Sequence, residues 1–160
     1  MSNEVDYKKI CQSTLGDELE TADCGALATV MQAHEFKDGE LLVTEGQKDD
    51  SLILLVEGRV AVINKTDGEE EVVYTMHEGE CAGTRAFVDR TPRKATLKAV
   101  GPATVYTMKP DAFESLLDHH PRIVYKVMRA LFRITHANLM RMNKETEELA
   151  RYIHKTGGRY

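Results

Sequence analysis

Short apolar and β-branched runs separated by glycines dominate residues 35–109, and this pattern predicts β-strands. Val60 and Val62 alternate with less apolar neighbours, so one face of that strand is expected to be buried. Gly58 and Gly68 each suit a tight reversal between two strands. The predicted strands are SLILLVE, RVAVINK, EVVYTMH, KATLKAV and ATVYTMK. Many short strands with regular turns are typical of an antiparallel sandwich or barrel.

Helical patterns lie on both sides of this zone. Residues 21–34, TADCGALATVMQAH, predict a helix that Thr21 caps and that carries Leu27, Val30 and Met31 on one face. After the strands, PDAFESLLDHH predicts a further helix, with its proline suited to the first turn.

A long helical pattern begins at Pro121 and continues to about residue 156. Its stripe follows the alternating three- and four-residue spacing of a coiled coil. The stripe consists of Met128, Leu131, Thr135, Asn138, Met142, Glu145, Leu149 and Tyr152. A second apolar edge, suited to face the strands, consists of Val124, Val127 and Ile134. A helix this long outreaches a small domain, which favours a twofold dimer along the stripe. The alternative is a terminal helix folded wholly onto its own domain.

Charge, apolar content and cysteine spacing argue against three classes of protein: those that bind nucleic acid, those that span a membrane and those built on disulfides. The 160 residues carry a net charge of −5, which disfavours gripping a nucleic-acid backbone. No apolar run reaches the roughly 18 residues of a membrane span, and the polar start MSNEVDYKKI is unlike a signal peptide. Cys11, Cys24 and Cys81 lack the close spacing of a disulfide framework and indicate reduced thiols. We therefore expect a cytoplasmic protein that does not associate with membranes.

Residues 82–96, AGTRAFVDRTPRKAT, hold small residues where a core would need bulk. Gly83 and Ala86 let the main chain come close to a ligand. If residues 84–88 form a helical turn, its free N–H groups favour an anion. Arg93 follows after a short loop, and its planar guanidinium can hold two phosphate oxygens. Together these features predict an anion cradle against the inside of the sheet.

This segment resembles the phosphate-binding cassette of the cyclic nucleotide-binding domains, including those of the catabolite-activator and fumarate-nitrate-regulator type. We refer to residues 82–96 as the cassette. The family pattern F-G-E-[LM]-A-L, four variable residues and P-R-x-A-T aligns to it without a gap. The matching residues are Gly83, Ala86, Pro92, Arg93, Ala95 and Thr96. An upstream family pattern, F-x-x-G-E-x-[LI]-x-x-E-G, is matched by Phe36, Gly39, Glu40, Leu42, Glu45 and Gly46. The resemblance covers about residues 10–155.

The resemblance implies an α+β fold class. The expected architecture is an antiparallel β-roll, or double-stranded jelly roll, with an N-terminal helix and a long C-terminal helix. The expected divisions are an N-terminal segment at residues 1–20, the β-roll domain at 21–120, a dimerisation helix at 121–156 and a tail at 157–160.

The cassette departs from the family pattern at the residue after its glycine. Relatives that bind cyclic nucleotides have Glu there, and they use it to hold the ribose 2′-hydroxyl; this chain has Thr84. Losing a charged acceptor costs roughly 1.5–3 kcal/mol, which is about one to two powers of ten in affinity. The Thr84 hydroxyl can replace part of that bond. Arg85 stands where relatives have Leu or Met. Pointing inward, Arg85 would suit a more anionic ligand; pointing outward, it is a solvated helix residue.

The cassette and the long helix together predict a site for cyclic AMP, cyclic GMP or another anionic ligand, with no other cofactor. The predicted ligand-binding residues are Gly83, Thr84, Arg85, Ala86, Arg93, Lys94, Ala95 and Asn138. Asn138 falls near the place where dimeric relatives read the base with a polar residue of the long helix. The alternative is that a buried Asn only sets the register of the dimer.

Two functions fit these observations. The first is a ligand-sensing regulatory module that binds a small anion and signals through its C-terminal helix to a partner protein. The second is a degenerate, ligand-free dimerisation or protein-interaction module. No nucleophile–base pair is recognisable and the histidines form no H-x-H cluster with Glu, so neither an enzyme nor a metal site is expected. The chain stops where family regulators begin their DNA-binding domain, so direct DNA binding is not expected.

Overall fold

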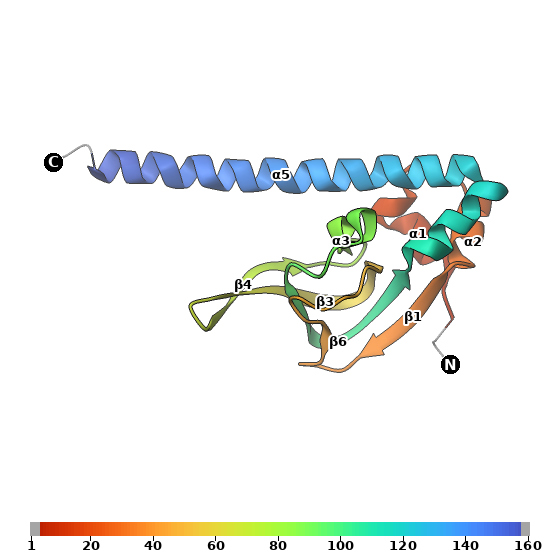
Figure 1. Cartoon of the computed structure of the whole chain (residues 1–160), viewed down its shortest axis with the longest axis horizontal. Coiled ribbons are helices and arrows are strands. Elements are labelled where there is room, and N and C mark those ends of the chain that lie inside the picture. Colours follow the sequence, from red (N-terminus) through yellow and green to blue (C-terminus); the bar gives the residue numbers. More distant parts are fainter. Residues whose placement is uncertain (1–3, 158–160) are drawn as a thin grey trace.

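The structure is a computed structural model that describes residues 4–157, so the tail predicted at 157–160 lies, after its first residue, outside the described part (Figure 1). The elements in chain order are α1 (Tyr7–Gln12), η1 (Thr14–Gly16), α2 (Thr21–Ala28), β1 (Met31–Phe36), β2 (Leu41–Val43), β3 (Leu52–Thr66), β4 (Glu69–Met76), β5 (Cys81–Ala82), α3 (Thr84–Asp89), β6 (Thr96–Met108), α4 (Pro110–Glu114), η2 (Ser115–Asp118) and α5 (Pro121–Gly157).

All strands pair antiparallel in one sheet with the order β1-β6-β3-β4, while β2 also pairs with β6 and β5 with β3. The long strands β3 and β6 pair along most of their length, from Leu52 opposite Met108 to Ile63 opposite Thr96. One half of this pair is extended by β1 and β5, and the other half by β2 and β4. The sheet is not closed, and the predicted α+β fold with an antiparallel roll is confirmed.

Two glycines that were predicted to separate strands lie inside continuous ones. Gly58 is part of β3 and Gly101 is part of β6, both with positive φ. The β3–β6 register shifts on either side of Glu57. A Cβ at residue 58 would overlap the Pro102 carbonyl oxygen, so glycine allows the two strands to cross closely at a bend. The hairpin predicted at Asp67-Gly68 is confirmed, because both residues have the positive φ of a type I′ turn.

The first five residues of β3, 52–56, are buried on both faces, which explains their continuous apolar run. Leu52 and Leu54 belong to a core cluster shared with the helices, whereas Ile53 and Leu55 belong to a second cluster inside the roll. The N-terminal helices and α5 therefore cover one face of the sheet, and the other face lines the roll.

The helix predicted at residues 21–34 is too long. Helix α2 ends at Ala28, and Met31 starts β1, where it pairs with Met108. The cap is Glu20 rather than Thr21, and the Glu20 amide donates to Asp23 at 3.0 Å. The N-terminal region contains α1, η1 and α2 rather than one helix. The helix predicted from Pro110 is present as α4, followed by the 3₁₀ turn η2.

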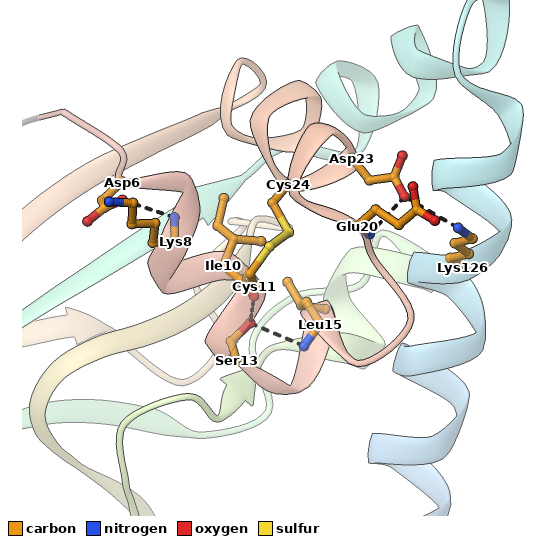
Figure 2. The surroundings of a disulfide bond; sticks show 10 residues. All are labelled: Asp6, Lys8, Ile10, Cys11, Ser13, Leu15, Glu20, Asp23, Cys24 and Lys126. Atoms are coloured by element: carbon orange, nitrogen blue, oxygen red, sulfur yellow. Dashed lines mark hydrogen bonds and ion pairs between the residues drawn. A yellow bond between two sulfur atoms is a disulfide. The ribbon is translucent and has the colours of Figure 1, made fainter.

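The expectation of three reduced thiols is wrong for two of them. Cys11 and Cys24 form a disulfide that joins α1 to α2, with 5.8 Å between their Cα atoms (Figure 2). Their separation of 13 residues carries no local signal, because only the packing of the two short helices brings them together. Cys81 is a free thiol, and its burial raises the pKa to about 12.

Helix α5 is anchored at its beginning and projects at its end. The second apolar edge joins the helix-side core, with Val127 fully buried and Val124 and Ile134 partly buried. Glu18 pairs with Arg129 and Arg133 at 3.1 Å each. After Asn138 most side chains are exposed, and the helix extends past the rest of the molecule (Figure 1). Helix α5 therefore does not fold wholly onto its own domain. No described helix has the length and apolar character needed to span a membrane.

Candidate ligand-binding site

The two sequence patterns meet through backbone hydrogen bonds. The Gly46 amide donates to the Arg93 carbonyl oxygen at 2.8 Å, and the Arg93 amide donates to the Gln47 carbonyl oxygen at 2.9 Å. The Glu45 amide donates to the Thr96 hydroxyl at 3.0 Å. The loop before β3 therefore holds the end of the cassette in place.

Gly83 makes room for the side chain of Arg93. Its φ of 79° lies in the left-handed region, directly before α3. A Cβ at this position would overlap Arg93 Nη1 and crowd the Ser51 carbonyl oxygen. From the sequence, the main chain at Gly83 was predicted to come close to a ligand. In the structure, the group that lies close to Gly83 is the guanidinium of Arg93.

Arg93 is the charged centre of the site. Its side chain is buried, with only 4% of the residue exposed. Arg93 Nη2 donates to the Ser51 carbonyl oxygen at 2.7 Å and lies 3.4 Å from Asp49 Oδ2. Nε and Nη1 are buried and have no hydrogen-bond partner among residues 4–157. Unpaired buried donors of this kind cost about 1–3 kcal/mol each, so the site holds donor capacity that an acceptor from outside can use.

Asp49 is a fixed counter-ion to this guanidinium. Burial acts to raise the pKa of its carboxyl, but the Ser51 amide and the Arg93 guanidinium outweigh burial and hold that pKa below its usual value. The Ser51 amide donates to Asp49 Oδ1 at 3.1 Å. Asp49 thus stays ionised and keeps Arg93 oriented before any ligand arrives.

The cassette encloses a small pocket of about 210 Å³, which we call the cradle. Seven of the eight predicted site residues line it: Gly83, Thr84, Arg85, Ala86, Arg93, Lys94 and Ala95. The remaining walls are Val43, Val62, Ala82 and Leu97. Because α3 is only six residues long, the positive charge of the cradle comes from Arg93 rather than from a helix dipole.

The side chain of Arg85 points outward. It is 71% exposed, and its Nε lies 3.6 Å from Asp89 one turn along α3. Of the two orientations left open by the sequence, the structure shows the solvated one. Arg85 therefore adds little to the charge inside the cradle.

A larger pocket of about 660 Å³, which we call the chamber, adjoins the cradle. The two pockets share the walls formed by Val62, Ala82, Lys94 and Ala95. The other side of the chamber is formed by α5, including Asn138, the eighth predicted residue. The structure thus places the cassette and the long helix around two adjoining pockets.

Several polar residues of the site were not predicted from the sequence. Asp49 and Ser51 lie in a polar loop that resembles any solvated turn, and nothing local marks them as partners of Arg93. The Tyr74 hydroxyl donates to Glu80 at 2.6 Å inside the chamber. The Arg141 guanidinium lies 4.2 Å from the centre of the Tyr74 ring. The three-residue spacing of Arg141 from Asn138 was the available signal, since such residues share a helix face.

Comparison with known proteins places these features in a family. The family model described as a cyclic nucleotide-binding domain matches residues 33–120. A cAMP-dependent protein kinase regulatory subunit of Mycosarcoma maydis is 30% identical over 117 residues, which cover 69% of this chain and 22% of that protein. A CRP-like cAMP-activated global transcriptional regulator of Mycobacterium tuberculosis is 25% identical over 132 residues, which cover 82% and 57% of the two chains.

The fold has close structural neighbours as well. The crystal structure of a cyclic nucleotide-binding domain from Methylobacillus flagellatus superposes with a TM-score of 0.81 at 23% identity, and the match covers 87% of this chain and 81% of that one. This chain spans between about a fifth and three fifths of the length of the two curated relatives.

Proposed function

Because this chain belongs to the cyclic nucleotide-binding domain family, we propose that it is a regulatory module that binds cyclic AMP, cyclic GMP or another small anion in the cradle. One observation carries this proposal: the buried Arg93 guanidinium keeps two unpaired N–H donors beside Gly83. A phosphate would accept from these donors and neutralise the charge. The names of both curated relatives refer to cAMP, which supports this ligand class.

The other cradle residues have narrower roles in this proposal. Main-chain amides near Gly83 and Ala86 approach the phosphate, and Thr84 contacts the sugar or the group in its place. Lys94 and Ala95 form the wall between the cradle and the chamber, where the base would lie. Asn138 would meet that base from α5.

Signalling follows from the position of α5. A ligand that fills the chamber touches the helix near Asn138, beyond its anchored beginning, so binding would bias where the exposed half points. The exposed apolar side chains of the predicted stripe in that half are Met142, Leu149 and Tyr152. We propose that this stripe forms a homodimer, through which the ligand signal reaches a partner protein.

A second candidate function is a ligand-free dimerisation or interaction module. It is favoured by Thr84, which lacks the carboxylate that holds the sugar in relatives. It is favoured further by Asp49 and Ser51, which already engage one edge of the Arg93 guanidinium.

Thermal unfolding with cyclic AMP and cyclic GMP at millimolar concentration, in phosphate-free buffer, separates the two functions. Ligand at a hundred times its dissociation constant adds about 2.7 kcal/mol of stability, which raises Tm by several degrees. We expect such a shift with at least one nucleotide, and we expect Arg93→Ala to abolish it. Arg59→Ala, at an exposed arginine of β3, is the matched control and should keep the shift.

Thr84→Glu restores the carboxylate of the family pattern and is expected to increase the shift. A shift that appears only in Thr84→Glu would mean that the cassette lost its sugar contact alone. No shift in either protein would favour the ligand-free module. A shift that survives Arg93→Ala would place the ligand outside the cradle.

A further inference from the structure

The cradle is too small to hold a nucleotide by itself. Its volume is about 210 Å³, whereas pockets for ligands of nucleotide size are typically about 300–1,000 Å³. A ligand anchored on Arg93 must therefore extend into the adjoining chamber of about 660 Å³. The charges along the chamber walls decide what the second part of that ligand can be.

Two cationic side chains line the chamber. Lys94, an exposed residue, lies on the wall shared with the cradle, next to Arg93 in sequence. Arg141 lines the chamber from α5. The Arg141 guanidinium lies over the face of the Tyr74 ring. Arg141 forms no ion pair within residues 4–154. A guanidinium that stacks on an aromatic ring keeps its in-plane N–H donors available for an anion.

The chamber also holds two carboxylates, Glu80 and Glu145, but neither forms an ion pair with Lys94 or Arg141 within residues 4–154. Glu80 uses both oxygens: Oε2 accepts from the Tyr74 hydroxyl at 2.6 Å, and Oε1 accepts from the His77 amide at 2.8 Å. Glu145 lies one helical turn after Arg141 and is exposed, so solvent screens its charge. Thr84 stands where relatives place a carboxylate, so no acidic residue lines the cradle, and the only negative charge beside Arg93 among residues 4–154 is that of Asp49, which pairs with it.

We propose that the ligand of this site carries a second phosphate, separated from the one on Arg93, which binds in the chamber against Lys94 and Arg141. The inference rests on the proposed function of the cradle and extends it to a ligand class. That class is nucleotides with two separated phosphate groups, either linear bisphosphates or cyclic dinucleotides. A cyclic mononucleotide would satisfy Arg93 and leave the two chamber cations without an anion.

Isothermal titration of the full chain in phosphate-free buffer tests this inference with four probes: cyclic AMP, adenosine 3′,5′-bisphosphate, cyclic di-AMP and cyclic di-GMP. We expect a two-phosphate probe to bind at least about tenfold more tightly than cyclic AMP, since a charge-assisted hydrogen bond contributes that much. Tighter binding of the bisphosphate identifies a linear ligand, and tighter binding of a dinucleotide identifies a cyclic one.

We call the affinity of the tightest two-phosphate probe divided by that of cyclic AMP the affinity ratio. Arg141→Gln should bring this ratio down to about one. Glu145→Gln should change that ratio little, because solvent already screens this exposed carboxylate. Arg151→Gln is the matched control, because this exposed arginine of α5 lies outside both pockets and pairs with Glu147. Circular dichroism of each variant verifies that α5 stays helical.

Two results would overturn the inference and leave the proposed function standing. One is cyclic AMP binding as tightly as every two-phosphate probe. The other is Arg141→Gln weakening cyclic AMP and the two-phosphate probes equally. If none of the probes binds and Arg93→Ala changes nothing, the proposed function fails together with this inference.

Discussion

At the scale of single residues, Arg93 combines burial with incomplete pairing. The guanidinium is oriented by Ser51 and Asp49, yet Nε and Nη1 remain without acceptors among the described residues. Stability alone does not require this charge, because replacing both members of a buried ion pair with apolar groups is often neutral or stabilising. The incomplete pairing is what a binding role for Arg93 requires.

Arg93→Met tests this interpretation through stability. Methionine has a similar length and fills the space without the unpaired donors. We expect the free energy of unfolding of the ligand-free protein to fall by less than the roughly 3–5 kcal/mol that a fully buried ion pair costs when one partner is removed, because the Asp49 side chain is 34% exposed and can be hydrated, while anion binding is lost. Urea unfolding measures the first quantity. A loss of more than about 3 kcal/mol would instead identify Arg93 as a structural residue.

Asp49→Asn should produce a stability difference that depends on pH. The pKa of Asp49 is lowered in the folded protein from its ordinary 3.8, so the ionised carboxylate stabilises the fold above that value. This contribution is lost as the pH falls through the folded-state pKa. The stability gap between parent and variant should therefore be constant near neutral pH and shrink in acid. Urea unfolding across pH measures it, and a gap that widens in acid would contradict the assignment.

More of the cradle residues could be predicted from the sequence than of the residues that surround the cradle. Gly83 and Arg93 stand in a pattern whose spacing survives in the chain, so their meeting could be predicted. Asp49 and Ser51 lie more than forty residues before Arg93. Only the fold of the loop before β3 places them beside the guanidinium. The orientation of Arg85 also depends on the fold, through its contact with Asp89 on the same helix.

At the scale of elements, glycine determines how β3 and β6 bend. Gly58 and Gly101 share a positive φ, but only residue 58 is crowded by a neighbouring strand. A glycine between two apolar runs is the sequence signal both of a turn and of a bend within one strand. The hairpin predicted at Gly58 was therefore wrong, because Gly58 lies inside β3. Residues 31–34 were predicted as part of a helix for a related reason. Met31 and Ala33 give an apolar pattern too short to distinguish a helix from a strand.

Alanine at the two glycines should have unequal effects. In Gly101→Ala the added Cβ meets open space, so the cost is only that of holding alanine in the left-handed backbone conformation, about 1–2 kcal/mol. Gly58→Ala must also displace the Pro102 carbonyl and Ala103, which adds about 1–3 kcal/mol. Denaturant unfolding of the two variants measures the difference. Equal losses would mean that the bend relaxes around a Cβ.

The Cys11–Cys24 disulfide should stabilise the N-terminal helices against which α5 packs. Closing a loop of this length contributes about 3 kcal/mol in the chain-entropy account. We expect Cys11→Ser/Cys24→Ser to lose about that much in oxidising buffer and to match the reduced parent. Cys81→Ser is the control and should keep the difference between oxidised and reduced protein. Unfolding curves that do not respond to reductant would contradict the bond.

At the scale of the whole molecule, α5 packs on the N-terminal helices at its beginning, lines the chamber further along and carries an exposed apolar stripe towards its end. The end of the helix projects past the sheet (Figure 1). The coiled-coil spacing predicted this helix from Pro121, and it is present. Leu131 of the stripe is nevertheless buried in the helix's own domain. The stripe available to a second copy therefore begins later than the spacing alone suggested.

Leu149→Lys should dissociate the proposed dimer, since it places a charge in the exposed stripe. Leu117→Lys is the matched control, because Leu117 is 50% exposed and Leu149 is 59% exposed, but Leu117 lies outside α5. Light scattering coupled to size-exclusion chromatography should show a dimer for the parent and the control and a monomer for Leu149→Lys. A monomeric parent at all concentrations would contradict the dimer.

The most direct test of the central claim is a crystal structure grown with millimolar cyclic AMP, or with the tightest probe of the titration. We predict phosphate density within hydrogen-bond distance of Arg93 Nε or Nη1, in the cradle beside Gly83. The claim would be contradicted by a nucleotide bound elsewhere, or by Arg93 Nε and Nη1 remaining without an acceptor while ligand saturates the protein in solution.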